Sequence, residues 1–315
     1  DSSQNKAIGD LYAEAVAAGA ELVIGPLDKG QVAALNQQEE LPVPVLALNY
    51  LDPADTASRS LFQFGLAIED DARQAARRAF VEGHRQAMTL VPRSSRGERA
   101  AAAFEAEWVE LGGEVVQASA FRGRGDFSDV IQSALQVDVS KRRAWDIRNI
   151  FGNRVEFEPR RRQDIDMIFL DANPADARQI KPTLAFHYAS KLPVYATRNI
   201  HSGKVDRKTD RDLNGIRFST LPWFFDQDSP EKAEILNNTS TSSAYHSLYA
   251  LGLDAYRLYP RLKQLQQVVR ARLYGSTGTL GLMDNHYIQR EQSWAQIRSG
   301  RAVPITSLVD ESMPK

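Results

Sequence analysis

The side chains that could carry out catalysis are scattered rather than grouped in a known motif. There are five histidines, at His84, His187, His201, His246 and His286. None has the spacing of a metal motif such as H-E-x-x-H, and no G-x-S-x-G nucleophile motif occurs. The glycine-rich stretch Gly275–Gly281 lacks the lysine of a phosphate-binding loop, so a turn explains it better. Asp164 and Asp166 flank the start of an apolar run, where solvation is the commoner role. The sequence therefore predicts no enzyme activity, no metal and no cofactor.

A basic segment, Lys141–Arg162, is the other feature with evident chemistry. Eight basic residues against three acidic ones give it a net charge of +5 in a chain of net charge −1. It contains an expected helix over Arg142–Gly152, whose apolar residues are Trp145, Ile147, Ile150 and Phe151. Two interpretations stay open. The segment could dock on an acidic partner through Arg142, Arg143 and Arg148, with the apolar set packed on the domain. It could instead be a solvated helix whose arginines pair with Asp164 and Asp166.

Composition sets limits on the class of protein. The chain has 315 residues, enough for about two domains of roughly 150 residues. Its 43% hydrophobic and 25% charged content is that of an ordinary globular protein. The small net charge argues against general binding to nucleic acid or anionic membranes. The absence of cysteine excludes disulfides, a cysteine nucleophile and thiolate metal sites.

Helical and strand patterns alternate along the first two thirds of the chain. A helix around Ile8–Val16 precedes two short strands, which end at Gly25 and Asn49 with a helix between them. A second series is expected to comprise helix Ile68–Gly83, strand Gln86–Pro92, helix Arg96–Gly112, strand Glu114–Phe121, helix Phe127–Leu135, strand Asp166–Ala172, helix Pro174–Ala189 and strand Pro193–Thr197. This alternation predicts two α/β units, each with a mainly parallel sheet flanked by helices.

The last third indicates how the two units are joined. A strand is expected within Gly215–Phe225, followed by helices Pro230–Asn237 and Ser243–Gln267 and a closing hairpin that turns at Ser299–Gly300. This order is similar to the two-lobed type I periplasmic-binding-protein fold. Lobe one is expected at 1–67 plus 221–278, and lobe two at 68–220 plus 279–315. The first strand–helix–strand unit of that fold is expected to be missing, so the chain is interpreted as an excised or processed piece.

Three segments carry a more specific resemblance. They read "AELVIGPLDK", "RRRQDIDMIFLDANPADARQIKPTLAFHYASKLPVYAT" and "GTLGLMDNHYIQRE". Together they resemble the LppC lipoprotein family, the outer-membrane activators of penicillin-binding proteins, over nearly the whole chain. The resemblance implies a periplasmic, membrane-anchored regulator with a class A penicillin-binding protein as its partner. In that family a helical-repeat domain and a lipid-bearing cysteine precede this region, and both are absent from this sequence. The expected protein is a monomer that reaches the membrane only through that lipid anchor.

The strand ends could still form a ligand cleft. In amino-acid-binding proteins of this fold, hydroxyl residues after the Gly-Pro strand hold the ligand carboxylate, and an acidic residue pairs with its ammonium. Here Asp28 and Lys29 follow the first strand, and Arg198 stands where the acidic residue is expected. The amino-acid site is therefore not intact. The candidate cleft residues are Asp28, Lys29, Asn49, Tyr50, Asn173, Arg198 and Asn199. Alternatively, Asp28 caps a helix, and Asn49 and Tyr50 end a strand.

Three consecutive aromatic residues, Trp223, Phe224 and Phe225, could form a second partner surface or pack in a core. Two functions therefore stay open. One is an activator domain that binds a peptidoglycan synthase. The other is a periplasmic solute-binding module with an altered small-molecule ligand. Nucleic acid is not expected as a partner, because no recognition motif accompanies the basic segment.

Overall fold

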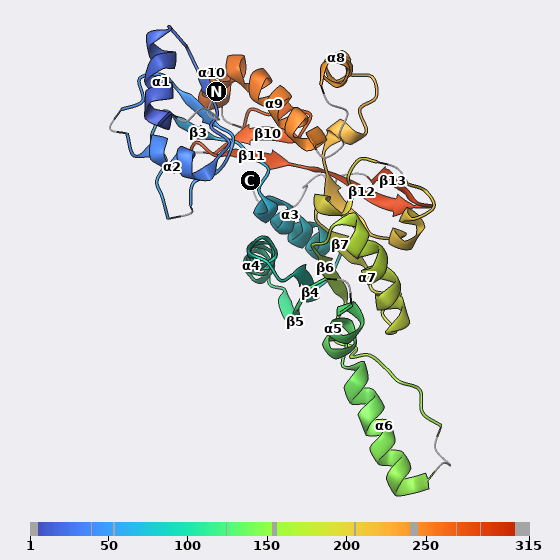
Figure 1. The fold of residues 1–315 in the computed structure, drawn as a ribbon. Coiled ribbons are helices and arrows are strands. Elements are labelled where there is room, and N and C mark those ends of the chain that lie inside the picture. Colours follow the sequence, from blue (N-terminus) through green and yellow to red (C-terminus); the bar gives the residue numbers. More distant parts are fainter. Residues whose placement is uncertain are drawn as a thin grey trace. The chain divides into compact units, whose positions relative to one another are not determined.

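The chain divides into two compact units, whose elements are labelled in Figure 1. The computed structural model describes residues 6–38, 40–52, 54–123, 125–152, 156–204, 206–239, 245–268, 270–283 and 285–305. Unit 1 comprises Asp1–Ala67 and Leu221–Gln292, and unit 2 comprises Ile68–Thr220 and Ser293–Lys315. The chain thus passes from one unit to the other three times.

Unit 1 begins with a small parallel sheet. Strands β1 (Val23–Ile24), β2 (Val45–Ala47) and β3 (Leu61–Gln63) pair in that order, with α1 (Ile8–Ala17) before β1 and α2 (Lys29–Asn36) between β1 and β2. The two helices bury Tyr12, Val32 and Leu35 against the apolar side chains of β2 and β3. The helices and strands expected here are confirmed.

The remainder of unit 1 combines helices with an antiparallel sheet. Strands β9 (Leu273–Tyr274), β10 (Thr279–Leu282) and β11 (Ile288–Glu291) pair in the order β11-β10-β9. Helices α8 (Pro230–Asn238), α9 (His246–Leu258) and α10 (Leu262–Gln267) accompany them. Residues Leu251 and Leu258 of α9 and Leu265 of α10 share one core with Leu280 of β10 and Phe62 of β3.

Two expectations for this region need correction. A single helix over Ser243–Gln267 is wrong, because a 3-10 turn, η6 (Tyr259–Arg261), separates α9 from α10. Its central residue is Pro260, which lacks the amide hydrogen that a continuing α-helix requires. The boundary at residue 278 also moves. Strand β10 pairs with both β9 and β11, and these pairings keep 279–292 in unit 1.

Unit 2 is built on one seven-stranded sheet. In spatial order its strands are β13 (Arg301–Ile305), β12 (Ser293–Arg298), β8 (Arg217–Thr220), β7 (Val194–Ala196), β6 (Met167–Leu170), β4 (Gln86–Pro92) and β5 (Glu114–Phe121). The last five run parallel, and β12 runs antiparallel to β8 and β13. The expected hairpin turn is confirmed, with positive φ angles at Ser299 and Gly300.

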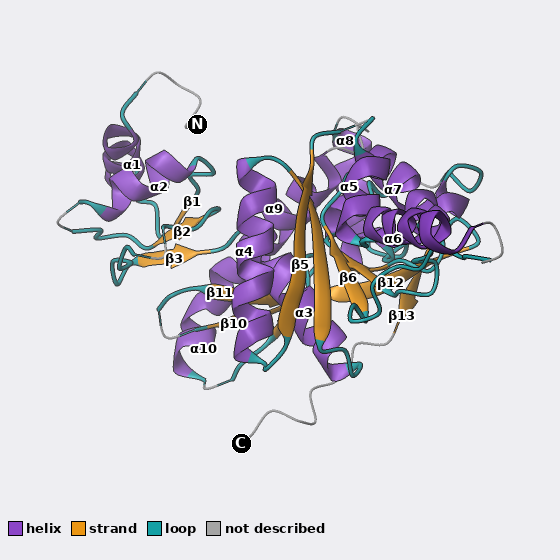
Figure 2. Ribbon diagram, turned by 90° about the horizontal axis from the view of Figure 1, so that it is seen from below, coloured by secondary structure: helices purple, strands orange, loops and turns teal. Residues whose placement is uncertain are grey.

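Helices cover both faces of this sheet. Figure 2 shows α3 (Ile68–Val81) and α4 (Ser95–Glu110) on one face and α5 (Phe127–Ala134) and α7 (Pro174–Phe186) on the other. Four buried alanines of α3 recur at helical spacing and allow close packing against Phe104 and Trp108 of α4 and the strands beneath. The parallel α/β architecture expected from the sequence is confirmed.

Helix α6 (Val137–Phe151) follows α5 after only two residues. It begins five residues before the helix predicted from Arg142, because Gln136 has a φ of 55° and redirects the chain. Figure 1 shows α6 extending from α5 beyond the rest of unit 2.

Candidate functional site

In unit 1, the polar residues after β1 bond to their own neighbours. Asp28 is the N-cap of α2, and its Oδ1 accepts a hydrogen bond of 2.9 Å from the Gln31 amide. The Lys29 ammonium lies 2.5 Å from Oδ1 of Asp52, and both side chains are largely exposed. These contacts support the capping interpretation of Asp28 and give Lys29 an ion-pair partner within the chain.

Asn49 and Tyr50 brace the end of β2. The Asn49 side chain donates to the Leu27 carbonyl oxygen at 2.8 Å and accepts from the Tyr50 amide at 2.9 Å. The Tyr50 hydroxyl donates to the Gly65 carbonyl oxygen at 3.0 Å, and its ring stacks on Tyr287 with centroids 4.6 Å apart. Both side chains therefore fix backbone geometry within unit 1.

In unit 2, the candidate residues likewise have internal partners. Asn173 caps α7, and its Oδ1 accepts a hydrogen bond of 2.9 Å from the Asp176 amide. The Arg198 guanidinium forms an ion pair with Asp71 of α3, a carboxylate with no exposed surface. Asn199 lies half-buried in the 3-10 turn η2 (Arg198–Ile200). The positive charge expected to repel an ammonium group is thus balanced by Asp71, which the sequence did not identify.

A second buried carboxylate lies at the carboxyl end of β6. Asp171 has no exposed surface, and its Oδ1 accepts a hydrogen bond of 2.6 Å from the Thr197 hydroxyl. Its Oδ2 lies 3.6 Å from Nε of Arg96. Because Asp171 and Thr197 end neighbouring parallel strands, their contact ties those two ends together. The signal in the sequence was an aspartate directly after an apolar run.

The glycine-rich turn after β9 is organised by a buried carboxylate of α9. Asp254 accepts hydrogen bonds of 2.6–2.7 Å from the Ser276 and Thr277 amides and from the Thr277 hydroxyl. A side chain at Gly275 would lie 2.5 Å from the Asp254 carboxylate, so this position needs glycine. The interpretation as a turn holds for Gly275–Gly278, whereas Thr279–Gly281 belong to β10.

A serine and a histidine do meet, between α5 and α7. The Ser128 hydroxyl and Nε2 of His187 lie 3.0 Å apart. Burial and the nearby Lys141 lower the pKa of His187, so the ring is neutral at pH 7. The imidazole is only 1% exposed, and among the described residues no carboxylate bonds to its other nitrogen. We therefore assign the contact a structural role. Within the described residues no set of three His, Cys, Asp or Glu side chains could hold a metal ion.

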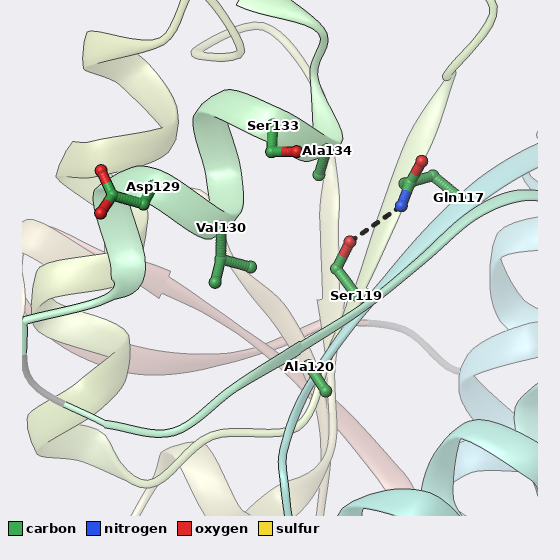
Figure 3. Close-up of a pocket in the computed structure, with 7 residues that line it drawn as sticks. All are labelled: Gln117, Ser119, Ala120, Asp129, Val130, Ser133 and Ala134. Atoms are coloured by element: carbon green, nitrogen blue, oxygen red, sulfur yellow. Dashed lines mark hydrogen bonds between the residues drawn. The ribbon is translucent and has the colours of Figure 1, made fainter. Parts of the chain in front are cut away.

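An open pocket lies beside these residues, between the edge strand β5 and α5. Figure 3 shows its lining, which is Gln117, Ser119, Ala120, Asp129, Val130, Ser133 and Ala134. The Gln117 side chain donates to the Ser119 hydroxyl at 3.1 Å and so satisfies part of the polar lining. This pocket contains none of the residues that the sequence suggested for a ligand.

The predicted partner residues on α6 are exposed. Arg142 lies 3.6 Å from Asp138 one turn earlier, and its side chain is 72% exposed. Arg143 and Arg148 are exposed and have no ion pair with another described residue. Further along the segment, Arg162 pairs with Asp164 at 2.5 Å. Internal pairing therefore accounts for Arg162 and, through one exposed contact with Asp138, for Arg142, but not for Arg143 and Arg148 among the described residues. Arg154 lies outside the described residues.

One expectation about apolar residues is wrong. The α6 set was expected to pack on the domain, yet Trp145 is 65%, Ile150 74% and Phe151 65% exposed. For the aromatic run after β8, the structure favours packing in a core, which was one of the two open interpretations. Trp223 is 1% exposed in a core with Leu221 and Ala250, and Phe224 packs against that core. Phe225 is only partly exposed. Trp223, the buried residue of the run, lies in the 3-10 turn η4 (Pro222–Phe224).

Comparison with known proteins gives the family. The sequence profile of the LppC putative lipoproteins matches residues 1–300. The chain belongs to the LppC lipoprotein family. One LppC relative, the penicillin-binding protein activator LpoA of Photobacterium profundum, is 31% identical over 302 residues, covering 93% of this chain and 48% of the relative. The chain thus spans about half the length of the curated relatives it matches.

Solved structures agree with membership in the LppC family. The C-domain of LpoA (YraM) from Haemophilus influenzae, a regulator of PBP1A, has a TM-score of 0.76 and 25% identity, covering 96% of this chain and 87% of that domain. A putative branched-chain amino acid ABC transporter protein from Chromobacterium violaceum has a TM-score of 0.67 and 27% identity, covering 91% and 84%. The fold is therefore the α/β periplasmic-binding-protein-like fold. None of the helices in the described part of the chain has the length and apolar character that a bilayer crossing requires.

Proposed function

We propose that this chain is the regulatory domain of an LppC lipoprotein, which binds and activates a class A penicillin-binding protein in peptidoglycan synthesis. The observation that carries the proposal is the likeness over 96% of the chain to the C-domain of a regulator of PBP1A. The family match over residues 1–300 supports it independently. The full-length protein would be held at the outer membrane by a lipid anchor, and this domain would act in the periplasm as a monomer.

The proposed role is not catalytic. Ser128 and His187 are the described serine and histidine that approach each other, and the imidazole is nearly inaccessible. We expect the purified chain to hydrolyse neither peptidoglycan nor model esters. Turnover that persisted through purification and was abolished by Ser128→Ala would contradict this expectation.

The partner surface that we propose is formed by the exposed arginines of α6, Arg142, Arg143 and Arg148. Charge complementarity with an acidic partner chiefly increases the association rate and fixes orientation. The alternative surface at Trp223–Phe225 is not retained, because its largest side chain is buried in unit 1.

A solute-binding module with an altered ligand is the second candidate. It is favoured by the likeness to the Chromobacterium violaceum protein, whose 27% identity to this chain is comparable to the 25% of the LpoA C-domain. Against it, Lys29, Asn49 and Arg198, which would contact a ligand, already contact other groups of the chain. Mass spectrometry of the chain purified from its own periplasm would detect a retained small molecule.

The deciding experiment is a binding measurement. The chain is immobilised, and the detergent-solubilised class A penicillin-binding protein encoded in the same genome is passed over it. We expect saturable binding and, in a lipid II polymerisation assay, an increased rate of glycan synthesis or crosslinking. A chain that retains a small molecule but neither binds nor stimulates the enzyme would favour the solute-binding candidate.

A further inference from the structure

Helix α6 has two halves with different surroundings. In the first half Val137, Ser140 and Ala144 are buried, and the Arg160 amide of the returning chain donates to the Ser140 hydroxyl at 3.1 Å. In the second half, Trp145–Phe151, every residue is exposed. Four of these seven are large and apolar, with exposed fractions of 65% for Trp145, 40% for Ile147, 74% for Ile150 and 65% for Phe151.

Exposing the apolar side chains of this second half to water is unfavourable in free energy unless another surface covers them. Burial of a large apolar side chain is favourable, so four exposed in two turns forgo substantial stabilisation. Short helices without tertiary contacts are also marginal in water. A cluster of exposed apolar residues on a globular protein commonly marks an interaction site.

The direction of the side chains points to a groove rather than a flat surface. At about 100° per residue, Ile147, Ile150 and Phe151 fall within an arc of about 100°, whereas Trp145 points roughly the opposite way. A flat membrane would bury one face and leave the other in water. A groove that encloses the helix end would bury both.

Charge identifies the chemistry of that groove. Arg143 lies two turns before Ile150 on the same side, and Arg148 lies between the directions of Phe151 and Trp145. The helix carries four basic residues against Asp138 and Asp146. Interleaved arginine and aromatic side chains are the usual composition of protein interface anchors.

We propose that Trp145–Phe151 is a docking helix that inserts into an apolar groove with an acidic rim on the penicillin-binding protein. The proposal rests on the proposed function and names the part of the chain that supplies the anchoring contacts. In this arrangement the arginines guide the approach, and the apolar residues slow dissociation.

Trp145 provides a reporter, because the other tryptophans, Trp108, Trp223 and Trp294, are at most 5% exposed. The chain is labelled with 5-fluorotryptophan, and the fluorine resonance of Trp145 is assigned with Trp145→Phe. On addition of unlabelled partner we expect this resonance to shift or broaden, while the other three change only through slower tumbling. A complex in which the Trp145 resonance behaves like the buried three would overturn the proposal.

Affinity gives the second readout. The variant Trp145→Ala, Ile150→Ala, Phe151→Ala should raise the Kd for the partner at least about thirtyfold, on the scale of interface anchors. The matched control replaces Phe186 and Val109, which are 73% and 58% exposed on α7 and α4 of the same unit. Its Kd should change less than about threefold. Circular dichroism must show that both variants keep their helix content.

The outcomes separate the two proposals. Wild-type binding with an unaffected triple variant would overturn the docking helix and leave the proposed function in place. No wild-type binding would overturn both. If the triple variant lost binding to phosphatidylglycerol vesicles while its partner affinity stayed unchanged, α6 would be assigned to a membrane. If it instead lost self-association in ultracentrifugation at unchanged partner affinity, α6 would be assigned to a second copy of the chain. Either result would overturn the proposal. If Trp145 were shielded from solvent in the full-length protein without partner, the end of α6 would contact the rest of that protein. This result would also overturn the proposal.

Discussion

Reversing the charge of the α6 arginines should weaken partner binding without unfolding the domain. The perturbation is Arg142→Glu, Arg143→Glu, Arg148→Glu, which changes the net charge by −6. If the arginines face an acidic partner, we expect a loss of about 1–3 kcal/mol, or roughly five- to 150-fold in Kd. Most of the change should be in the association rate and should shrink as salt shortens the screening length.

The cost in folding stability follows from the contacts of each arginine. Arg142 loses an exposed pair with Asp138 at 3.6 Å, a contact of about 0.3–0.5 kcal/mol. Arg148 lies in the last turn of α6, where the interaction of a cation with the helix dipole stabilises the helix by about 0.3–1 kcal/mol. Arg143 has no ion pair with a described residue, so its replacement should cost at most about 0.5 kcal/mol. The sum is at most about 2 kcal/mol, which is below the roughly 5–15 kcal/mol stability of a typical domain, so the variant should remain folded.

The assay measures both quantities on one preparation. Surface plasmon resonance at low and high salt gives the rates, and urea unfolding gives the free energy of unfolding. The control with the same charge change replaces three exposed arginines elsewhere in unit 2, namely Arg122, Arg207 and Arg211. Unchanged affinity of a folded triple variant at low salt would refute the reasoning. A large loss of stability with unchanged affinity per folded molecule would support the solvated-helix interpretation instead.

Three further predictions concern the remaining polar groups. Burial raises the pKa of Glu82, but hydrogen bonds from Tyr195 and Arg78 and the charge of Arg217 outweigh it, and the net pKa is lowered. The stabilisation by Glu82 is therefore complete above its ordinary pKa of 4.5 and is lost as pH falls through the lowered pKa of the folded state. Glu82→Gln should lower the urea midpoint at pH 7 and remove much of the decline of that midpoint below pH 4.5. A variant whose midpoint declines as steeply as that of the wild type would contradict this. Asp254→Ala removes the acceptor of three buried hydrogen bonds and should cost about 3–5 kcal/mol of unfolding free energy, whereas a loss under 1 kcal/mol would show that water replaces it. Calorimetry should show no binding of leucine or glutamate tighter than millimolar, and micromolar affinity would exclude our assignment of these residues to structural roles.

Local pattern was enough to predict most of the secondary structure. Strand β4 and the buried strand at Met167–Leu170 are short apolar runs, and α3 and α4 have apolar residues at helical spacing, so each element carries its own signal. The break at Pro260 also carries a local signal, because proline lacks the amide hydrogen that a continuing helix uses, but apolar residues at helical spacing on both sides favour a single helix. The unit boundary at residue 292 has no local signal in the sequence, because it depends on which strands pair with β10.

Side-chain partners were predictable only where they are close in sequence. Asp28 bonds to the amide three residues later, and capping of this kind follows from residue type and position. Arg198 pairs with Asp71, 127 residues away, and Asp254 organises a turn 22 residues further along. Both contacts depend on the fold, and a single sequence carries no direct signal for them.

The apolar residues of α6 show a different kind of failure. Helical periodicity tells which residues share a face, but it does not tell which surface covers that face. The sequence predicts that Trp145, Ile150 and Phe151 pack on the domain, because such residues are usually buried within their own chain. The structure leaves them exposed beside Arg143 and Arg148, which have no ion pair with a described residue. The same apolar chemistry then argues for burial against a different molecule. In the described part of unit 2 nothing covers the end of α6. Exposing these apolar side chains to water is unfavourable, and contact with another molecule would remove that cost. The apolar residues that were expected to pack within the chain are therefore the strongest argument for an interface.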